Sequence, residues 1–325
     1  MRTQLIRAAV VALAVGAGIA AGYSAGAQPV PEKGEQTSLK PNQVMRVGEK
    51  VITAEQLLAR IWDFENMLEP KDRVLAPSLA YLRDTALLEL ESKRLGFALT
   101  TQEIDAETKL QIERVKKQVH DQTRGMVPFE KWLERQGLTS EQFEAYIRER
   151  AYLILAKRVL VHYFEQTTPS VESSHILHKT LAEAQATHKI LKETDAKKLR
   201  EKFEDLAVQR STDPGAGVSK GGLPRLYEND DTLVRPVADA IWALKDGQFS
   251  EPVKSEFGWH VVVRWRTIVP PVRTVAEMRA QLLKEPDRDR DVEYFNRWVR
   301  WVFNTQKYPL ERRLPGFDCP PDKQG

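Results

Sequence analysis

The sequence predicts an α+β protein in which a compact mixed domain is inserted between helical segments. Three observations predict it. Helix-capping patterns recur in the first half of the chain, the central part follows the order β-α-α-β-α-β, and helical periodicity returns after Pro270-Pro271. A compact run of strands and helices in this order is typical of one domain. The chain of 325 residues is long enough for two domains.

The composition argues against several classes of protein. Hydrophobic residues make up 42% and charged residues 29%, as in ordinary soluble globular chains, so wholesale disorder is not expected. The formal net charge is only +3, so no nucleic acid is expected as a partner. The single cysteine, Cys319, cannot form an internal disulfide, and it excludes a zinc site built on several thiolates.

The N-terminal segment predicts export. Two arginines accompany an apolar stretch over 8–22, and small residues at 25–27 match the site that a signal peptidase recognises. We therefore interpret 1–27 as a signal peptide, with Gln28 as the first mature residue. The alternative is an uncleaved anchor, but a spanning helix needs ~20 strongly apolar residues. No cysteine near the cleavage site could accept a lipid, so we expect a periplasmic protein without a membrane span.

The next region predicts helices. Residues 28–43 are polar and contain Pro and Gly, which indicates a disordered leader. Residues 44–166 predict an all-helical region. Within it, Thr53, Thr100 and Thr139 are each followed three residues later by Glu or Gln, which is the pattern of a capping box. The third precedes apolar residues at helical spacing over about six turns.

The pattern changes near Pro169 and predicts the mixed domain, at 170–269. Its first strand alternates and contains β-branched residues, and its last strand is rich in Val, Trp and Ile. The expected elements are a strand at 173–179, helices at 181–192 and 196–209, a Gly-rich loop at 213–222, a short helix at 236–244 and a strand at 259–269.

Two further helices are expected within 272–308, at 275–284 and 292–304. The second presents a broad apolar face with several aromatic residues. We expect this face to pack on the helical N-terminal region. An exposed binding surface or a dimer contact is the alternative. Residues 309–325 form a Pro-rich tail.

Histidines are the candidates for chemistry. His175 and His260 lie in the first and last strands of the mixed domain, so pairing of these strands can bring both imidazoles to one side of the sheet. His178 is offset from His175 by an odd number, which places it on the other face of the strand, so we expect no joint metal site. The other histidines lie in charged helical contexts and are expected at the surface: His120, His162 and His188.

Four motifs follow one another between His175 and Arg264. They are SHIL at the first strand, FEDLAVQRSTDPGAG at 203–217, KGGLP at 220–224 and VADAIWALKDGQFSEPVKSEFGWHVV at 237–262. This series resembles the parvulin family of prolyl isomerases. The flanking helices look like those of SurA- and PrsA-type extracytoplasmic foldases, in which they form a chaperone module. The resemblance implies a small antiparallel sheet with surrounding helices, no cofactor, and unfolded exported polypeptides containing Xaa-Pro as substrates.

The resemblance also implies the catalytic residues. His175 and His260 correspond to the family's paired core histidines, and Asp213 falls where parvulins place an Asp or Cys of the catalytic site. Rotation about an Xaa-Pro bond makes no covalent bond to the substrate but faces a barrier of ~18–20 kcal/mol. We expect the three side chains to form a polar wall that favours the twisted amide over the planar one, without a nucleophile.

Four residues are implied for substrate binding. Leu223 and Leu233 fall near positions that line the pocket for proline, Val237 stands where many members have Phe, and Phe257 lies beside the closing strand. The sequence departs from the family in Val237 and in the loop 221–224, where GGLP replaces Gly-Gly-Asp-Leu-Gly. The alternative is therefore a folding chaperone whose parvulin domain is weak or inactive. A structural envelope component that reuses the fold is a third hypothesis.

Overall fold

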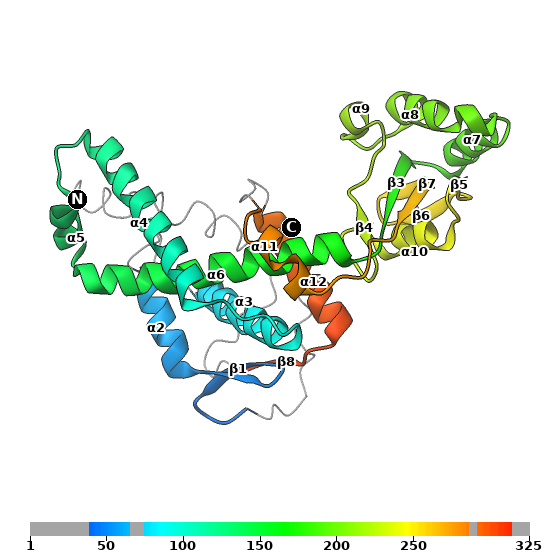
Figure 1. Cartoon of the computed structure of the whole chain (residues 1–325). Coiled ribbons are helices and arrows are strands. Elements are labelled where there is room, and N and C mark those ends of the chain that lie inside the picture. The colour runs from blue at the N-terminus through cyan, green and yellow to red at the C-terminus, as the bar shows by residue number, and fades with distance from the viewer. Residues whose placement is uncertain (1–38, 66–74, 286–290, 314–325) are drawn as a thin grey trace. The chain divides into compact units, whose positions relative to one another are not determined.

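The computed structural model describes residues 39–65, 75–285 and 291–313 (Figure 1). It divides into two compact units. The terminal unit comprises the described residues up to Tyr163 and from Arg273 onward, and the inserted unit is Phe164–Val272. The predicted signal peptide 1–27, the leader up to residue 38 and the tail from residue 314, with Cys319, lie outside the described residues. Within the described ranges, no helix combines the length and apolar character needed to cross a membrane.

The terminal unit is built mainly of helices. The capping boxes expected at Thr53, Thr100 and Thr139 are confirmed, because each Thr hydroxyl accepts from a backbone N–H three residues later and that residue's side chain accepts from the Thr backbone N–H. These caps satisfy donors that the first helical turn leaves unpaired. The helices are α2 (Ala54–Glu65), α3 (Leu75–Arg94), α4 (Thr101–Thr123), α5 (Phe129–Gln136), α6 (Ser140–Thr167), α11 (Val275–Leu282) and α12 (Asp291–Gln306).

Segments from both ends of the described chain meet in a three-stranded antiparallel sheet of order β2-β1-β8. β1 (Gln43–Val47) and β2 (Lys50–Thr53) form a hairpin whose turn contains Gly48 at φ +55°, a conformation that glycine adopts without steric cost. β8 (Leu310–Arg312) pairs with the other edge of β1. The sheet helps to bury Met45 completely.

This sheet corrects three expectations. Residues 44–166 are not all helical, the leader predicted over 28–43 is ordered from Leu39 onward, and the tail predicted over 309–325 includes a strand. Leu39 is buried, and its carbonyl accepts a hydrogen bond from Arg313 Nη1 at 2.8 Å. Strands of three to five residues are too short for their alternation to be distinguished from helical spacing. The partner of β8 also lies at the other end of the chain.

The apolar face of α12 lies in the core of the terminal unit. Trp298, Val299 and Val302 are buried, and Lys157 Nζ of α6 lies 4.4 Å from the ring centre of Phe295. These side chains are therefore core residues and do not form an exposed binding surface. The neighbouring helix α11 joins the same unit through one buried cluster: Phe97, Val159, Val275, Met278 and Leu282.

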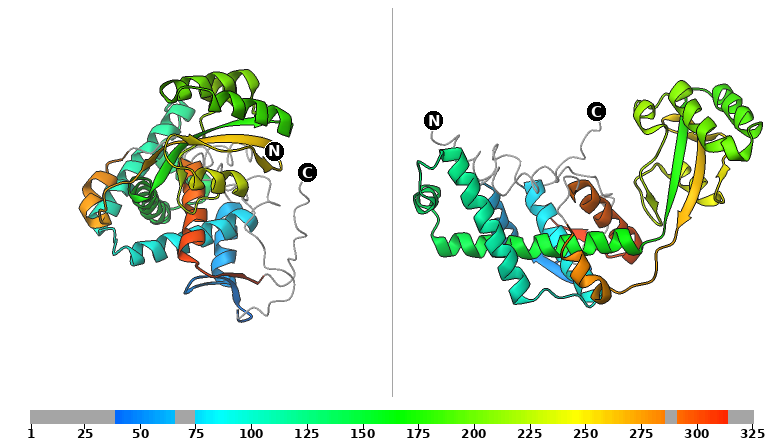
Figure 2. Two further views of the ribbon diagram at one scale, coloured as in Figure 1. Left: turned by 90° about the vertical axis from the view of Figure 1, so that its right-hand side faces the viewer. Right: turned by 45° about the horizontal axis from the view of Figure 1, so that its top comes forward.

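The inserted unit contains a five-stranded antiparallel sheet with helices on both faces, which confirms the predicted α+β class (Figure 2). The strand order is β4-β3-β7-β5, and β6 also pairs with β7. The strands are β3 (Ser170–His178), β4 (Leu226–Tyr227), β5 (Gln248–Phe249), β6 (Val253–Ser255) and β7 (Gly258–Ile268). The helices are α7 (Leu181–Lys192), α8 (Leu199–Arg210), α9 (Ala216–Ser219) and α10 (Arg235–Ala243), with a short 3₁₀ helix at Ala196–Lys198.

Alternation along β3 and β7 separates two hydrophobic clusters. Ile176 of β3 and Val261 of β7 pack against Phe203 of α8 on one face. Val262 packs on the opposite face with α10, where it contacts the cluster that contains Ile241. Successive side chains of a strand point to opposite faces, so the register of β3 against β7 decides which residues meet on the α10 side.

The three histidines that were expected at the surface only partly follow that expectation. His120 is exposed, as predicted, but His162 is 4% exposed and lies within the buried stretch of α6. His188 is half-buried, with Nε2 3.3 Å from Glu251 and its ring 5.4 Å from that of Phe249. The charged residues at helical spacing from His162, Arg158 and Glu165, are themselves partly buried, so the local composition did not reveal that His162 is buried.

Candidate active site

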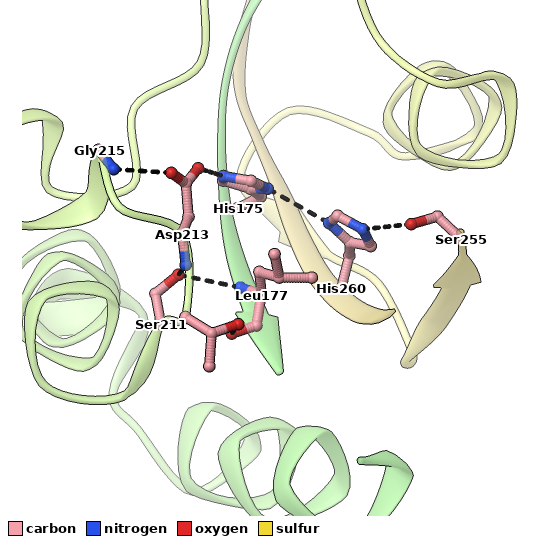
Figure 3. Close-up of polar contacts among 8 residues, drawn as sticks. His175, Leu177, Ser211, Asp213, Gly215, Ser255 and His260 are labelled. Atoms are coloured by element: carbon pink, nitrogen blue, oxygen red, sulfur yellow. Dashed lines mark hydrogen bonds and ion pairs between the residues drawn. The ribbon is translucent and has the colours of Figure 1, made fainter. Parts of the chain in front are cut away.

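Four side chains of the inserted unit form a continuous line of polar contacts, the polar network (Figure 3). Asp213 Oδ2 lies 2.6 Å from His175 Nε2. The Nδ1 atoms of His175 and His260 are 3.3 Å apart, and His260 Nε2 is 2.7 Å from Ser255 Oγ. The three predicted catalytic side chains are therefore brought together, and Ser255 joins them.

The register of the two long strands positions the histidine pair. His175 lies opposite Val262, and Leu177 lies opposite His260. Residues opposite one another share a face of the sheet, so both imidazoles point to the α10 side. The ring centres are 5.5 Å apart with planes inclined by 23°, and both side chains are buried. The expectation that strand pairing would place both rings on one side of the sheet is confirmed.

The loop after α8 positions the carboxylate. Ser211 Oγ accepts from the backbone N–H groups of Leu177 (3.1 Å) and Asp213 (3.2 Å), and the Thr212 N–H donates to the Leu177 carbonyl at 2.8 Å. The loop is thus tied to β3 two residues from His175. The Gly215 N–H donates to Asp213 Oδ1 at 2.7 Å and fixes the other carboxylate oxygen.

Sequence reasoning missed Ser211 and Ser255 as parts of the site. Ser211 begins the stretch Ser-Thr-Asp-Pro-Gly, in which hydroxyl and carboxylate side chains commonly bond nearby backbone groups, so a signal was present. Ser255 stands three residues before Gly258, which begins the last strand of the inserted unit. Nothing local distinguishes its hydroxyl from that of an exposed turn residue.

Burial and charge fix the ionisation of the network. Burial by itself raises the pKa of Asp213, but the Gly215 N–H and the His175 ring outweigh it, and the pKa lies below its ordinary value. Burial, together with the nearby His175, lowers the pKa of His260 to about 4. At neutral pH Asp213 is therefore a carboxylate and His260 is uncharged.

The hydrogen-bond chemistry assigns a direction to the network. A carboxylate only accepts, so His175 donates from Nε2 to Asp213. In the arrangement with one proton on each ring, His175 Nδ1 accepts from His260 Nδ1–H, and His260 Nε2 accepts from the Ser255 hydroxyl. Every member of the network then has a partner, and the imidazoles hold fixed orientations beside the carboxylate.

The four predicted substrate residues lie in different environments. Leu223 and Leu233 are half-buried and pack against the α10 cluster. The Leu223 N–H donates to the Ser173 carbonyl at 3.0 Å, which holds Leu223 two residues from His175 along β3. Val237 is only 2% exposed and is one of the buried residues of that cluster, whereas Phe257 is 66% exposed.

Gly221 is required where the loop crosses β3. Its backbone has φ +77°, and a Cβ there would lie 2.6 Å from the His175 carbonyl oxygen and 2.8 Å from Ala207 Cβ. The Gly221 carbonyl accepts from the His175 N–H at 2.8 Å. The glycine therefore permits direct contact between the loop and the backbone of a site residue.

We expect Gly221→Ala to destabilise the inserted unit by about 2–4 kcal/mol, because both the backbone conformation and the contacts are unfavourable for a side chain. Gly217→Ala is the matched control, since a Cβ at Gly217 meets nothing within 4 Å. Urea unfolding, monitored by hydrogen exchange in the inserted unit, measures the free energy of unfolding of both variants. Equal stability of the two variants would contradict the prediction.

Comparison with known proteins agrees with these motifs. The family model of the PPIC-type PPIase domain (rotamase) matches residues 173–264. The inserted unit is a parvulin-type domain. The foldase protein PrsA of Staphylococcus aureus is 28% identical over 194 residues, which cover 56% of this chain and 58% of that protein. The match thus spans little more than half the length of this relative.

Solved structures also match. The parvulin domain is similar to Pin from Cenarchaeum symbiosum, with 41% identity over 29% of this chain and 90% of that chain, at a TM-score of 0.25. The peptidylprolyl isomerase PrsA of Bacillus cereus matches 81% of this chain and 93% of its own at 21% identity, with a TM-score of 0.34.

The described residues offer no metal site. Among residues 39–65, 75–285 and 291–313, no group of three His, Cys, Asp or Glu side chains is arranged to hold an ion. His178 lies on the opposite face of β3 from His175, is buried, and lies across from Trp259 of β7. Burial lowers the pKa of His178.

Proposed function

We propose that this protein is a peptidyl-prolyl cis–trans isomerase that assists the folding of exported proteins. The observation that carries the proposal is the polar network of Asp213, His175 and His260 next to the apolar cluster that includes Leu223. An isomerase needs both features together. An apolar slot holds the proline ring, while a fixed polar wall stabilises the amide as it twists out of plane and loses its resonance.

In this proposal the polar network acts without a covalent step. His260, with a pKa of about 4, is too weak a base at neutral pH to activate the Ser255 hydroxyl as a nucleophile. The network instead supplies fixed dipoles and one negative charge, which cost little reorganisation when the amide twists. Leu223 and Leu233 would contact the pyrrolidine ring, Val237 would support them from below, and Phe257 would contact a flanking residue.

A folding chaperone is the second candidate. Val237 is small and buried, so it does not form the aromatic wall that Phe provides in many parvulins. The named relative is a foldase, and the parvulin domain here is inserted in a separate helical unit. Together with the N-terminal segment that predicts a signal peptide, this supports exported, unfolded polypeptides as substrates and the periplasm as the site of action.

The test is the cis–trans exchange rate of a panel of Xaa-Pro peptides, measured by exchange NMR with the chain from Gln28 onward. We expect acceleration by the wild type and its loss in the triple variant His175→Ala/His260→Ala/Asp213→Ala. His120→Ala, which removes an exposed histidine of the terminal unit, should keep full activity. The triple variant must retain the circular dichroism of the wild type. A wild type that accelerates no peptide would reject the isomerase and leave the chaperone.

A further inference from the structure

An arginine on the α10 side of the sheet ties β7 to the end of α10. Arg264 Nη1 donates to the Trp242 and Leu244 carbonyls at 3.3 and 2.8 Å, and its guanidinium lies 5.6 Å from the centre of the Trp242 ring. These carbonyls belong to the last turn and the C-cap of α10, where a helix leaves carbonyl groups without intrahelical partners. The Arg264 side chain is only 13% exposed, so these contacts are largely sheltered from water.

The same guanidinium holds the turn that follows α10. Arg264 Nε lies 3.0 Å from Asp246 Oδ1, and the Gly247 N–H donates to the Arg264 carbonyl at 2.7 Å. The Asp246 carboxylate accepts from the Thr267 N–H at 2.9 Å and from its hydroxyl at 2.7 Å, and Arg264 Nη2 donates to that hydroxyl. The Thr267 hydrogen bonds, together with Arg264, hold the pKa of Asp246 below its ordinary value. Arg264, Asp246 and Thr267 thus form one charged unit, the arginine clamp.

A β-bulge turns Arg264 toward α10. Glu172 of β3 lies opposite Arg266, but the next residue, Ser173, lies opposite Arg264, so Trp265 is an extra residue in β7. Trp265 packs against the cluster on the α8 side of the sheet, where Arg266 also bonds to Glu172. The bulge therefore sends two successive side chains to the α8 side and leaves Arg264 on the side of the active site.

The packing of α10 on the sheet is largely apolar, since Val237 lies in one cluster with Val262 of β7. Burial of apolar surface is non-directional, so this cluster alone leaves the helix some freedom along its axis. The hydrogen bonds from Arg264 remove that freedom, because each requires a donor–acceptor distance of about 3 Å and an open angle. Leu223 and Leu233 pack against the same cluster. A shift of α10 would therefore change the space next to these leucines.

We propose that Arg264 is a positioning residue that fixes α10 against β7 and thereby sets the width of the slot for the substrate proline. The slot itself rests on the proposed function. A slot of fixed width should select the ring of proline over that of pipecolic acid, which has one more methylene. An added methylene in a well-packed apolar site forces its neighbours to move, so discrimination of about tenfold or more is expected.

The positioning role is tested without any substrate, by methyl NMR of the full chain. In Arg264→Ala the methyl resonances of Leu233 and Val237 should shift. The Leu244 amide, which donates to the Ile241 carbonyl, should exchange with solvent about tenfold faster, as expected when a hydrogen bond to a charged group is lost nearby.

Two further variants control this experiment. Arg266→Ala removes the neighbouring arginine of β7, which bonds to Glu172 on the α8 side, and it should leave the methyl resonances of Leu233 and Val237 in place. Arg264→Lys keeps the charge but lacks the planar fork of donors, so it should give an intermediate shift. It also covers the case in which Arg264→Ala does not fold. Methyl resonances that stay in place in both Arg264 variants would overturn the proposal.

The effect on the slot is tested by NMR titration with two short peptides that differ only in the ring, one with Ala-Pro and one with Ala-pipecolic acid. The wild type and Arg266→Ala should bind the proline peptide about tenfold or more tightly than the other. In Arg264→Ala and in Asp246→Ala this ratio should fall to about twofold. The double variant should be no worse than Arg264→Ala, since the two residues act as one unit.

A general loss of stability would weaken both peptides equally, so an unchanged ratio in Arg264→Ala would overturn the specificity role. Turnover is recorded in the same samples by exchange NMR. Binding with the ring preference but no acceleration would reject the isomerase and uphold the role of Arg264. Acceleration without the preference would do the reverse. A wild type that binds neither peptide would reject the slot, while the methyl resonances still decide whether Arg264 positions α10.

Discussion

Replacing Asp213 by alanine should lower kcat/KM for Xaa-Pro peptides by about 100-fold, in the range found when one preorganised electrostatic group is removed from an active site. The change removes the negative charge from the network and leaves His175 Nε2, now 2.6 Å from the carboxylate, without its acceptor. Both imidazoles then lose the orientation that the carboxylate enforces. Exchange NMR of the peptide that the wild type accelerates most measures the effect.

Two variants separate charge from structure in this experiment. Asp213→Asn keeps an acceptor for His175 but not the charge, so it should retain more activity than Asp213→Ala. Asp239→Ala removes an exposed carboxylate of α10 that pairs with Arg235, and it should leave activity unchanged. If Asp213→Ala isomerises as fast as Asp239→Ala, the polar network is not the catalytic wall.

Acid should destabilise the inserted unit before Asp213 becomes protonated. His260 has a pKa of about 4 in the folded protein, below the value of ~6.5 for a free histidine. The unfolded chain therefore binds more protons between these values, and the free energy of unfolding falls as pH decreases from about 6.5 to about 4. We expect His260 to contribute a loss on the order of 1–2 kcal/mol, after allowance for solvent screening.

His178 adds to this loss, since burial lowers its pKa in the same direction. Asp213 acts in a lower window. Its pKa is depressed in the folded state, so its contribution is complete above the unfolded value of ~3.9 and disappears only as pH falls through the folded value. Above about pH 5, where the Asp and Glu side chains of the unfolded chain bind few protons, the loss is therefore assigned to buried histidines.

The free energy of unfolding of the inserted unit is measured between pH 7.5 and 4.5 by hydrogen exchange with mass spectrometry. Its slope against pH tests the prediction. His260→Gln removes one titrating group and should reduce the slope, whatever its effect on stability at pH 7.5. His120→Gln, at an exposed histidine of the terminal unit, should leave it unchanged. A slope that is the same in His260→Gln and wild type would show that His260 is not held neutral by burial.

The sequence by itself determined the features that depend on neighbours a few residues apart. The caps at Thr53, Thr100 and Thr139 are local hydrogen bonds between residues i and i+3, so their pattern is visible in any stretch of chain. The long strands β3 and β7 carry strong alternation and β-branched residues. The ordered motifs around His175 and His260 were sufficient to indicate the histidine pair and the family.

The tertiary structure alone decided what depends on distant segments. β8 pairs with β1 from the other end of the described chain, and no pattern within three residues specifies such a partner. His162 is buried because neighbouring elements pack around α6, although its local sequence is charged. Ser255 belongs to the site because the β6–β7 register brings its hydroxyl to His260. Hydrogen bonds and burial between remote segments arise only when the chain has folded, and they placed these residues where local sequence could not.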